Sequence, residues 1–232
     1  SSGVNAQILE LVIQNDGKIM IGGNFTTSTC SKILRLNDDG TIDSTFNAGL
    51  NTNKPVKSIE IDESGNYYVG GEFTIFNGVS KSKIVKLLND GSIDNSFDIG
   101  SGIFNGNVFD LMVNRENAII VIGSFSAYNG QSANNIIALN PNGTKNTGFN
   151  SPFPSASLRY LNSIIQLDDG YYVFGGFYSS PAAPFLYKTL ENGEFDLSFW
   201  IWMGIPPWEI CPFTAAGKRI ERIKTIVYRV FI

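Results

Sequence analysis

The sequence contains no histidine, and this absence excludes several kinds of chemistry at once. Histidine is the commonest general base, the usual partner of a Ser or Cys nucleophile and the commonest zinc ligand. The 232 residues hold two cysteines, Cys30 and Cys211, which could form one bridge but are too few for a disulfide framework or a four-thiolate metal site. We therefore expect no catalytic residues, no metal site and no cofactor.

Charge is also scarce. Charged residues make up 16% of the chain, against about 25% in an ordinary globular protein. The net charge of −4 and the pI near 4.9 argue against a protein that binds nucleic acid by neutralising phosphates. No uninterrupted apolar run approaches the length of about 18 residues that a membrane span needs, so we expect no membrane insertion.

A repeated unit of about 50 residues dominates what is present. Four units lie near residues 7–55, 56–107, 108–159 and 160–210, and successive marker residues are 48 to 52 positions apart. The markers are Phe25, Phe73, Phe125 and Phe177; Gly40, Gly91, Gly143 and Gly193; and Phe46, Phe97, Phe149 and Phe199. Three sets of markers with one period indicate a true internal repeat.

Each unit has the pattern of short strands joined by tight turns. Apolar runs such as Tyr67-Tyr68-Val69 are typical of strands that are buried on both faces. The segment Lys32–Leu36 alternates polar and apolar residues, which predicts one wetter face. Asp-Gly pairs, as at Asp16-Gly17 and Asp39-Gly40, are turn signals because both residues tolerate positive φ. Three or four strands in such a unit match the size of a propeller blade.

We therefore predict an all-β fold, a β-propeller or propeller arc of four blades, with a fifth blade as the open alternative. Glycine precedes the marker phenylalanine in strands such as Gly22-Gly23-Asn24-Phe25 and Gly70-Gly71-Glu72-Phe73. A glycine inside a strand indicates that another backbone comes close to it. We expect the phenylalanines to fill the space between neighbouring blades.

The phrase RLNDDGTIDSTFNAG, which follows the strand GKIMIGGNF, resembles the delta sixty repeat, a β-propeller repeat of bacterial and phage proteins. The resemblance covers about residues 7–200 and is carried in the first unit by Arg35, Leu36, Asn37, Asp39, Gly40, Asp43 and Phe46. The second unit matches at Leu87, Asp90, Gly91, Asp94 and Phe97. The third unit has Asn146 in place of the usual aspartate, and the fourth keeps Gly193, Asp196 and Phe199. The resemblance implies a fold and no catalytic activity.

The end of the chain departs from the repeat. All three tryptophans lie between residues 200 and 208, and residues 218–232 read KRIERIKTIVYRVFI. From Cys211 onward five basic residues face one acidic residue, a net charge of +4, and the rest of the chain carries −8. The segment IKTIVY resembles VKSIEI, which begins at Val56. We predict that residues 211–232 form a C-terminal strand that closes a blade or begins a fifth one, with a docking tail or an altered reading frame as alternatives.

Two groups of residues are candidates for a site. Asp43, Asp94 and Asp196 recur at one position of the unit, and we interpret them as braces that accept hydrogen bonds from turn amides, because symmetry places one in each blade. Exposed aromatic rings are the other candidate, since they stack on sugars. The ligand-binding candidates are Tyr68, Tyr128, Tyr172, Trp202 and Trp208.

Asn37-Asp38-Asp39-Gly40 has some likeness to a calcium loop, but Arg35 stands where the first ligand belongs. The leading functional hypothesis is a non-catalytic structural or interaction module, from a phage virion or tail or from a bacterial surface, with other protein subunits as partners. The alternatives are a lectin-like propeller that binds glycans and, less favoured, a glycosidase or lyase with two carboxylates in the central funnel. The expected location is the virion or the cell surface.

Overall fold

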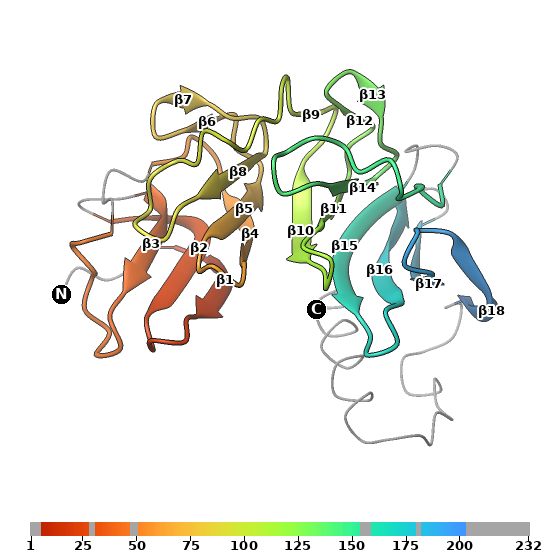
Figure 1. Ribbon diagram of the computed structural model, residues 1–232, viewed down its shortest axis with the longest axis horizontal. Helices are drawn as coiled ribbons and strands as arrows, with labels where there is room; N and C mark the ends of the chain where they lie inside the picture. Colours follow the sequence, from red (N-terminus) through yellow and green to blue (C-terminus); the bar gives the residue numbers. More distant parts are fainter. Residues whose placement is uncertain (1–5, 28–30, 47–50, 154–158, 180–181, 203–232) are drawn as a thin grey trace.

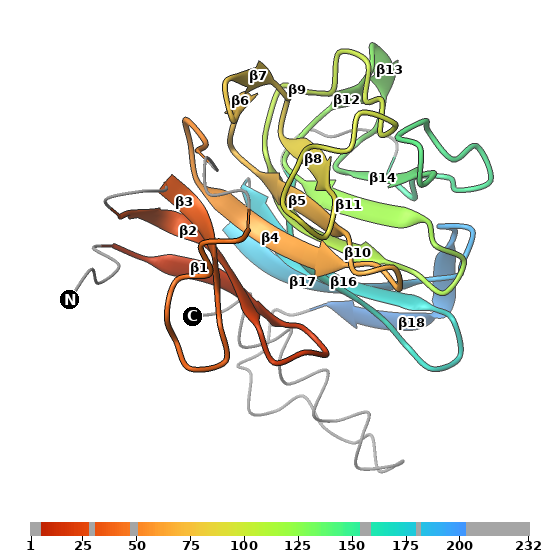
Figure 2. The ribbon, with the colours of Figure 1, turned by 60° about the vertical axis from the view of Figure 1, so that its left-hand side comes forward.

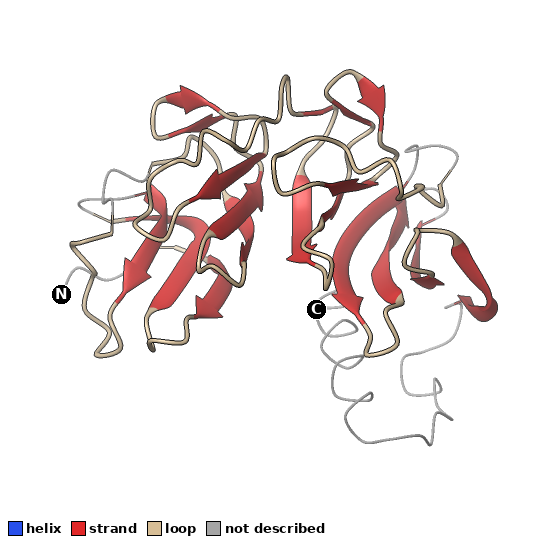
Figure 3. Cartoon of the chain, in the orientation of Figure 1, coloured by secondary structure: helices blue, strands red, loops and turns tan. Residues whose placement is uncertain are grey.

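The computed structural model describes residues 6–27, 31–46, 51–153, 159–179 and 182–202. All regular structure in these segments is β-strand, in antiparallel sheets (Figure 3). Within them, no helix is long and apolar enough to cross a membrane. Both cysteines, Trp208 and the predicted segment 211–232 lie outside the described residues.

Four sheets follow one another along an arc (Figure 1). Blade 1 contains β1 (Ile8–Ile13), β2 (Ile19–Thr26) and β3 (Ser31–Leu36). Blade 2 contains β4 (Val56–Ile61), β5 (Tyr67–Gly71) and β8 (Ile84–Leu87). Blade 3 contains β10 (Val108–Val113), β11 (Ile119–Gly123) and β14 (Ile136–Leu139). Blade 4 contains β15 (Arg159–Gln166), β16 (Tyr172–Ser179), β17 (Ala182–Thr189) and β18 (Phe195–Trp202).

The two middle blades carry additional short strands along one edge of the arc. In blade 2 these strands are β6 (Ile75–Phe76) and β7 (Val79–Ser80), and beside blade 3 they are β9 (Ile103–Phe104), β12 (Ala127–Tyr128) and β13 (Gln131–Ser132). The β6–β7 and β12–β13 hairpins both turn on an Asn-Gly pair with positive φ, at Asn77-Gly78 and Asn129-Gly130. We call these two hairpins the ear hairpins.

The four blades share one register. Each first strand, β1, β4, β10 or β15, is the inner strand of its blade, and each has a bulge just after its start. The residue opposite the start of the bulge is a glycine in every blade: Gly23, Gly71, Gly123 and Gly176. A Cβ built on Gly71 would lie 2.3 Å from the carbonyl oxygen of Pro55, so the backbone approach predicted from the glycines is confirmed.

Neighbouring blades pack through apolar faces, and their inner strands lie next to one another (Figure 2). A Cβ on Gly22 would lie 2.7 Å from Cγ1 of Val56, and one on Gly70 would lie 2.6 Å from Cγ1 of Val108. The missing side chains therefore make room for the next blade. The strands β5 and β11 are buried at every residue, as predicted for strands covered on both faces.

Most of the marker phenylalanines lie in the core, but Phe177 is not at the position equivalent to Phe25, Phe73 and Phe125. Phe25, Phe73 and Phe125 are fully buried, but Phe177 is 38% exposed. Gly176 is the equivalent of Gly23 in the register, so the equivalent of Phe25 is Tyr178, one residue later. Because alternate residues of a strand point to opposite faces, an offset of one residue places Phe177 on the other side of the sheet.

Candidate functional site

A central channel of about 440 Å³ lies where the four inner strands meet. Each blade contributes three consecutive residues: Glu10–Val12, Ser58–Glu60, Asp110–Met112 and Ile164–Gln166. The lining is therefore a mixture of apolar side chains with three carboxylates, those of Glu10, Glu60 and Asp110. The repeat places one short stretch from each blade at a shared centre, as its period predicts.

Asp110 joins three blades inside this channel. Its Oδ1 accepts hydrogen bonds from the Ser58 hydroxyl, at 2.9 Å, and from the Leu111 amide, at 2.9 Å. Its Oδ2 accepts a hydrogen bond from the Ile164 amide at 3.0 Å. The residue is only 6% exposed, so these donors replace most of the water that would otherwise solvate the carboxylate. Asp110 therefore links blades 2, 3 and 4 through hydrogen bonds.

Asp110 is not among the residues predicted from the sequence. The signal was nevertheless present, because each inner strand has one polar residue just after its bulge: Glu10, Ser58, Asp110 and Ser163. A polar residue at the same place in four apolar strands indicates a position with a common hydrogen-bonding role. Alignment of the inner strands, in addition to the turns, would have found it.

A second recurring cluster lies at the turns that close the blades. Its core is an ion pair between a basic residue of the third strand and the aspartate eight residues later. Arg35 Nη2 lies 2.8 Å from Asp43 Oδ2, Lys86 Nζ lies 3.6 Å from Asp94 Oδ2, and Lys188 Nζ lies 3.4 Å from Asp196 Oδ2. Blade 3 has Ala138 and Asn146 at these two positions, so both members of the pair are replaced together.

Asp43 and Asp94 of this cluster also brace their turns, as predicted for these two positions. Asp43 Oδ1 accepts hydrogen bonds from the amide and the hydroxyl of Thr45, and Asp94 Oδ1 accepts the same pair from Ser96. Burial alone would raise the pKa of Asp43, but hydrogen bonds from Lys18 and Thr45 outweigh it and hold that pKa well below its ordinary value. The carboxylate therefore stays ionised at neutral pH and serves structure.

The wetter face predicted for Lys32–Leu36 is wrong at Arg35, which is buried. Its guanidinium lies 4.2 Å from the centre of the Phe46 ring and donates to the Tyr67 hydroxyl, at 3.2 Å, and to the Asn89 carbonyl, at 2.9 Å. Tyr67 and Asn89 belong to blade 2, so Arg35 connects the first two blades. The alternation of polar and apolar residues predicts that Arg35 faces solvent, but its hydrogen-bond partners come from the neighbouring repeat.

The three candidate tyrosines are core residues. Tyr68, Tyr128 and Tyr172 are all buried, and burial raises the pKa of each phenol. Tyr172 accepts a hydrogen bond from Asn114 of blade 3 at 2.8 Å, and Tyr128 donates to the carbonyl of Gly143. No ring face is left for a sugar, so the expectation of stacking is wrong at these three positions. The backbone of Trp202 lies at the end of β18, and Trp208 is outside the described residues.

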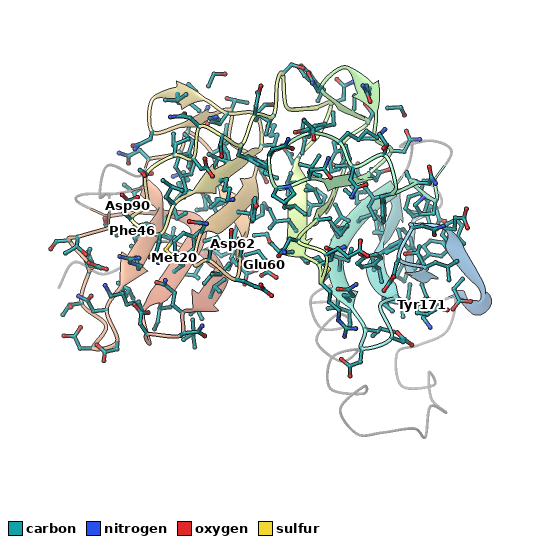
Figure 4. All side chains as sticks on the ribbon, viewed as in Figure 1. Met20, Phe46, Glu60, Asp62, Asp90 and Tyr171 are labelled. Atoms are coloured by element: carbon teal, nitrogen blue, oxygen red, sulfur yellow. The ribbon has the colours of Figure 1, made fainter. Side chains whose placement is uncertain are left out.

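Two further clefts lie between neighbouring blades. One of about 530 Å³ lies between blades 1 and 2, and its lining includes Asp16, Glu60, Asp62 and Glu63. Glu60, near the end of β4, and Asp62, just after it, are labelled in Figure 4. The other, of about 240 Å³, lies between blades 3 and 4 and includes Ala138 and Asn146, the positions from which the ion pair is missing. No group of three or more metal-ligating side chains gathers anywhere in the described segments.

These features define a β-propeller protein, an arc of repeated blades around a channel. Residues 14–46, 64–97 and 117–149 match the model of a family described as "Domain of unknown function (DUF5122) beta-propeller". The chain therefore carries repeats of a β-propeller repeat family. The matched segments come from the first three units, and each ends at a marker phenylalanine, Phe46, Phe97 or Phe149.

Among solved structures, the chain is similar to one titled "Crystal structure of a protein of unknown function from Bacteroides caccae at 1.35 A resolution". The two chains are 11% identical, the TM-score is 0.36, and the similarity covers 86% of this chain and 82% of the other. A search of curated proteins finds no match.

Proposed function

We propose that this chain is a non-catalytic interaction module that holds protein partners in a phage virion or tail, or in a bacterial surface assembly. The observation that carries the proposal is a set of exposed apolar residues along the ear-hairpin edge of the arc. Ile75 and Val79 of the β6–β7 hairpin and Phe104 of β9 are all exposed. These strands lie along one edge of the arc, at the top of Figure 1 (Figure 1). Apolar side chains grouped on one edge are typical of a protein contact.

The structural contacts of three aspartates support the same proposal. Asp43 and Asp94 are held by ion pairs and turn amides, and Asp110 by donors from three blades. A general acid or nucleophile needs a carboxylate that can reach a substrate. The resemblance to the delta sixty repeat adds the virion or surface setting, because the family includes proteins of both kinds.

Substitution of the apolar edge tests the proposal. Val79→Asp and Phe104→Asp are expected to leave the fold and the melting temperature nearly unchanged, because both side chains are exposed. Each should lower the amount of the chain found in purified virions, or on the cell envelope, at least tenfold. The measurement is quantitative mass spectrometry of the particle and envelope fractions.

Ser80→Asp is the matched control, since it adds the same charge to the same hairpin at an exposed polar residue. It should keep the parent level of incorporation. A parent chain that is a soluble monomer, absent from both particles and envelope, would contradict the proposal. So would unchanged incorporation of the two variants.

A further inference from the structure

The first blade presents apolar side chains that the other blades bury. Ile8, Leu11 and Ile13 of β1 are 45%, 49% and 65% exposed. At the positions of Ile8 and Leu11, blade 2 has Val56 and Ile59, which are fully buried against blade 1. In a repeat, a face of this kind is the contact surface for a preceding blade, and no described blade lies there. We call Ile8, Leu11 and Ile13 the open face of blade 1.

The two ends of the arc border one space. Residues of β1 and β15 line the same central channel, although β1 packs against β4 and β15 against β10. Each middle inner strand, β4 or β10, lies between two others. Among the described strands, β1 and β15 each have one such neighbour. One further inner strand would therefore touch both ends.

The sequence contains a segment with the pattern of an inner strand. Residues 223–228, IKTIVY, have the same or similar residues as 56–61, VKSIEI, at the first four positions, and at the fifth Val227 stands in place of Glu60. Counted from the residue opposite the bulge glycine, the four inner strands observed have an apolar residue at the first and fourth positions and Glu10, Ser58, Asp110 or Ser163 at the third. Ile223, Ile226 and Thr225 fit these positions.

Chain length agrees with the same location. The last described strand ends at Trp202, so 20 residues connect it to Ile223. An extended chain of that length reaches up to about 65 Å, enough to cross a small domain.

We propose that residues 223–228 form a fifth inner strand, seated between β15 and β1, that covers the open face of blade 1. Val12 packs against the core formed with blade 2, and Met112 against the core formed with blade 4. In the proposed placement Val227 would have the equivalent position, against Leu11. Ile226 would then face blade 4, as Ile59 faces Gly22 of blade 1. Thr225 would face Glu10, as the hydroxyl of Ser58 faces Asp110.

The rate of thiol labelling at position 11 tests this proposal. Leu11→Cys is made in a full-length chain with Cys30→Ser and Cys211→Ser, and the rate is measured at a concentration where the mass is that of a monomer. Labelling should become at least tenfold faster when Ile226→Asp or Val227→Asp is added, because either charge removes the strand from its apolar contacts. A chain that ends at Gly217 should be labelled at the same fast rate.

Lys224→Asp is the control for charge. It changes the net charge by more than Ile226→Asp does, but it lies at the position of the half-exposed Lys57 and keeps the apolar contacts. It should label within about twofold of the parent. A synthetic peptide of residues 218–232 should slow the labelling of the shortened chain, and the same peptide with reversed sequence should not.

Two results would overturn the proposal. The first is a parent rate as fast as that of the Ile226→Asp variant, which would leave the open face uncovered. The second is slow labelling only at concentrations where the mass doubles, which would assign the covering to a second copy of the chain. Neither measurement depends on particle or envelope binding, so the proposed function stands or fails separately.

Discussion

Replacement of Asp110 by alanine is expected to lower the free energy of unfolding by about 2 kcal/mol or more, because two buried donors lose their acceptor and each costs about 1–3 kcal/mol. These donors are the Ser58 hydroxyl of blade 2 and the Ile164 amide of blade 4, whereas the Leu111 amide of blade 3 loses one of its two acceptors and keeps Ser58 Oγ at 3.2 Å. A domain has only about 5–15 kcal/mol of net stability, so this loss is a large fraction of the total. Urea unfolding, followed by intrinsic fluorescence, gives the value.

Ser58→Ala is the control for Asp110→Ala. It removes one donor and leaves the two amides on the carboxylate, so its expected cost is about 1 kcal/mol. If the two variants cost the same, Asp110 does not link three blades. If the chain unfolds with separate transitions for the two halves only in Asp110→Ala, the role of this carboxylate as the inter-blade link is supported further.

Gly123→Ala is expected to lower the free energy of unfolding by about 1–3 kcal/mol or more, the usual cost of overpacking. A Cβ at this position would lie 2.0 Å from the carbonyl oxygen of Asn107, which belongs to the backbone and cannot rotate away. The bulge after Val108 brings that carbonyl close, so the methyl group forces β10 away from β11. The change is measured as the shift of the urea midpoint at an unchanged m value.

Gly148→Ala is the matched control, because its Cβ would meet only the side-chain oxygen of Asn146, at 3.2 Å, and this residue is exposed. Its effect should stay within about 0.5 kcal/mol. A Gly123→Ala variant as stable as Gly148→Ala would show that the strand and the bulge do not approach as described.

The arrangement of strands was predictable because the same local signals occur four times. Asp-Gly and Asn-Gly pairs fix the turns, and the residues Gly17, Gly40, Gly91 and Gly193 all have positive φ. Runs such as Tyr67–Gly71 are apolar throughout because both faces are covered by neighbouring blades. One unit alone would have left the sheet partners undecided, whereas the repeat supplies them.

The error at Phe177 has a simple cause. The fourth unit has one residue fewer between the glycine pair and its phenylalanine, so matching the phenylalanines shifted the strand by one position. A shift of one residue exchanges the buried and exposed faces. The glycines that oppose the bulge are the more reliable markers, because the close backbone approach accepts no other residue.

The polar network was not predictable from single units, because its partners belong to different blades. Arg35 donates hydrogen bonds to Tyr67 and Asn89 of blade 2. Asp110 accepts hydrogen bonds from Ser58 of blade 2 and Ile164 of blade 4. The tyrosines were assigned to the surface for the same reason. The hydroxyl of Tyr172 has its partner, Asn114, in the preceding repeat, and that of Tyr128 has its partner, the Gly143 carbonyl, in a distant turn of its own repeat; these partners permit burial.

The most direct test of the arc is a set of three distances between equivalent positions. Ser44, Asn95 and Thr147 are exposed. They directly follow three equivalent turn residues, which are Asp43, Asp94 and Asn146. Pairs of spin labels at these sites, in a chain with Cys30→Ser and Cys211→Ser, are compared by pulsed electron paramagnetic resonance. The 44–95 and 95–147 distances are expected to be equal. The 44–147 distance should be clearly shorter than their sum, because the blades curve around a common channel. Unequal neighbouring distances, or a 44–147 distance equal to the sum, would contradict it.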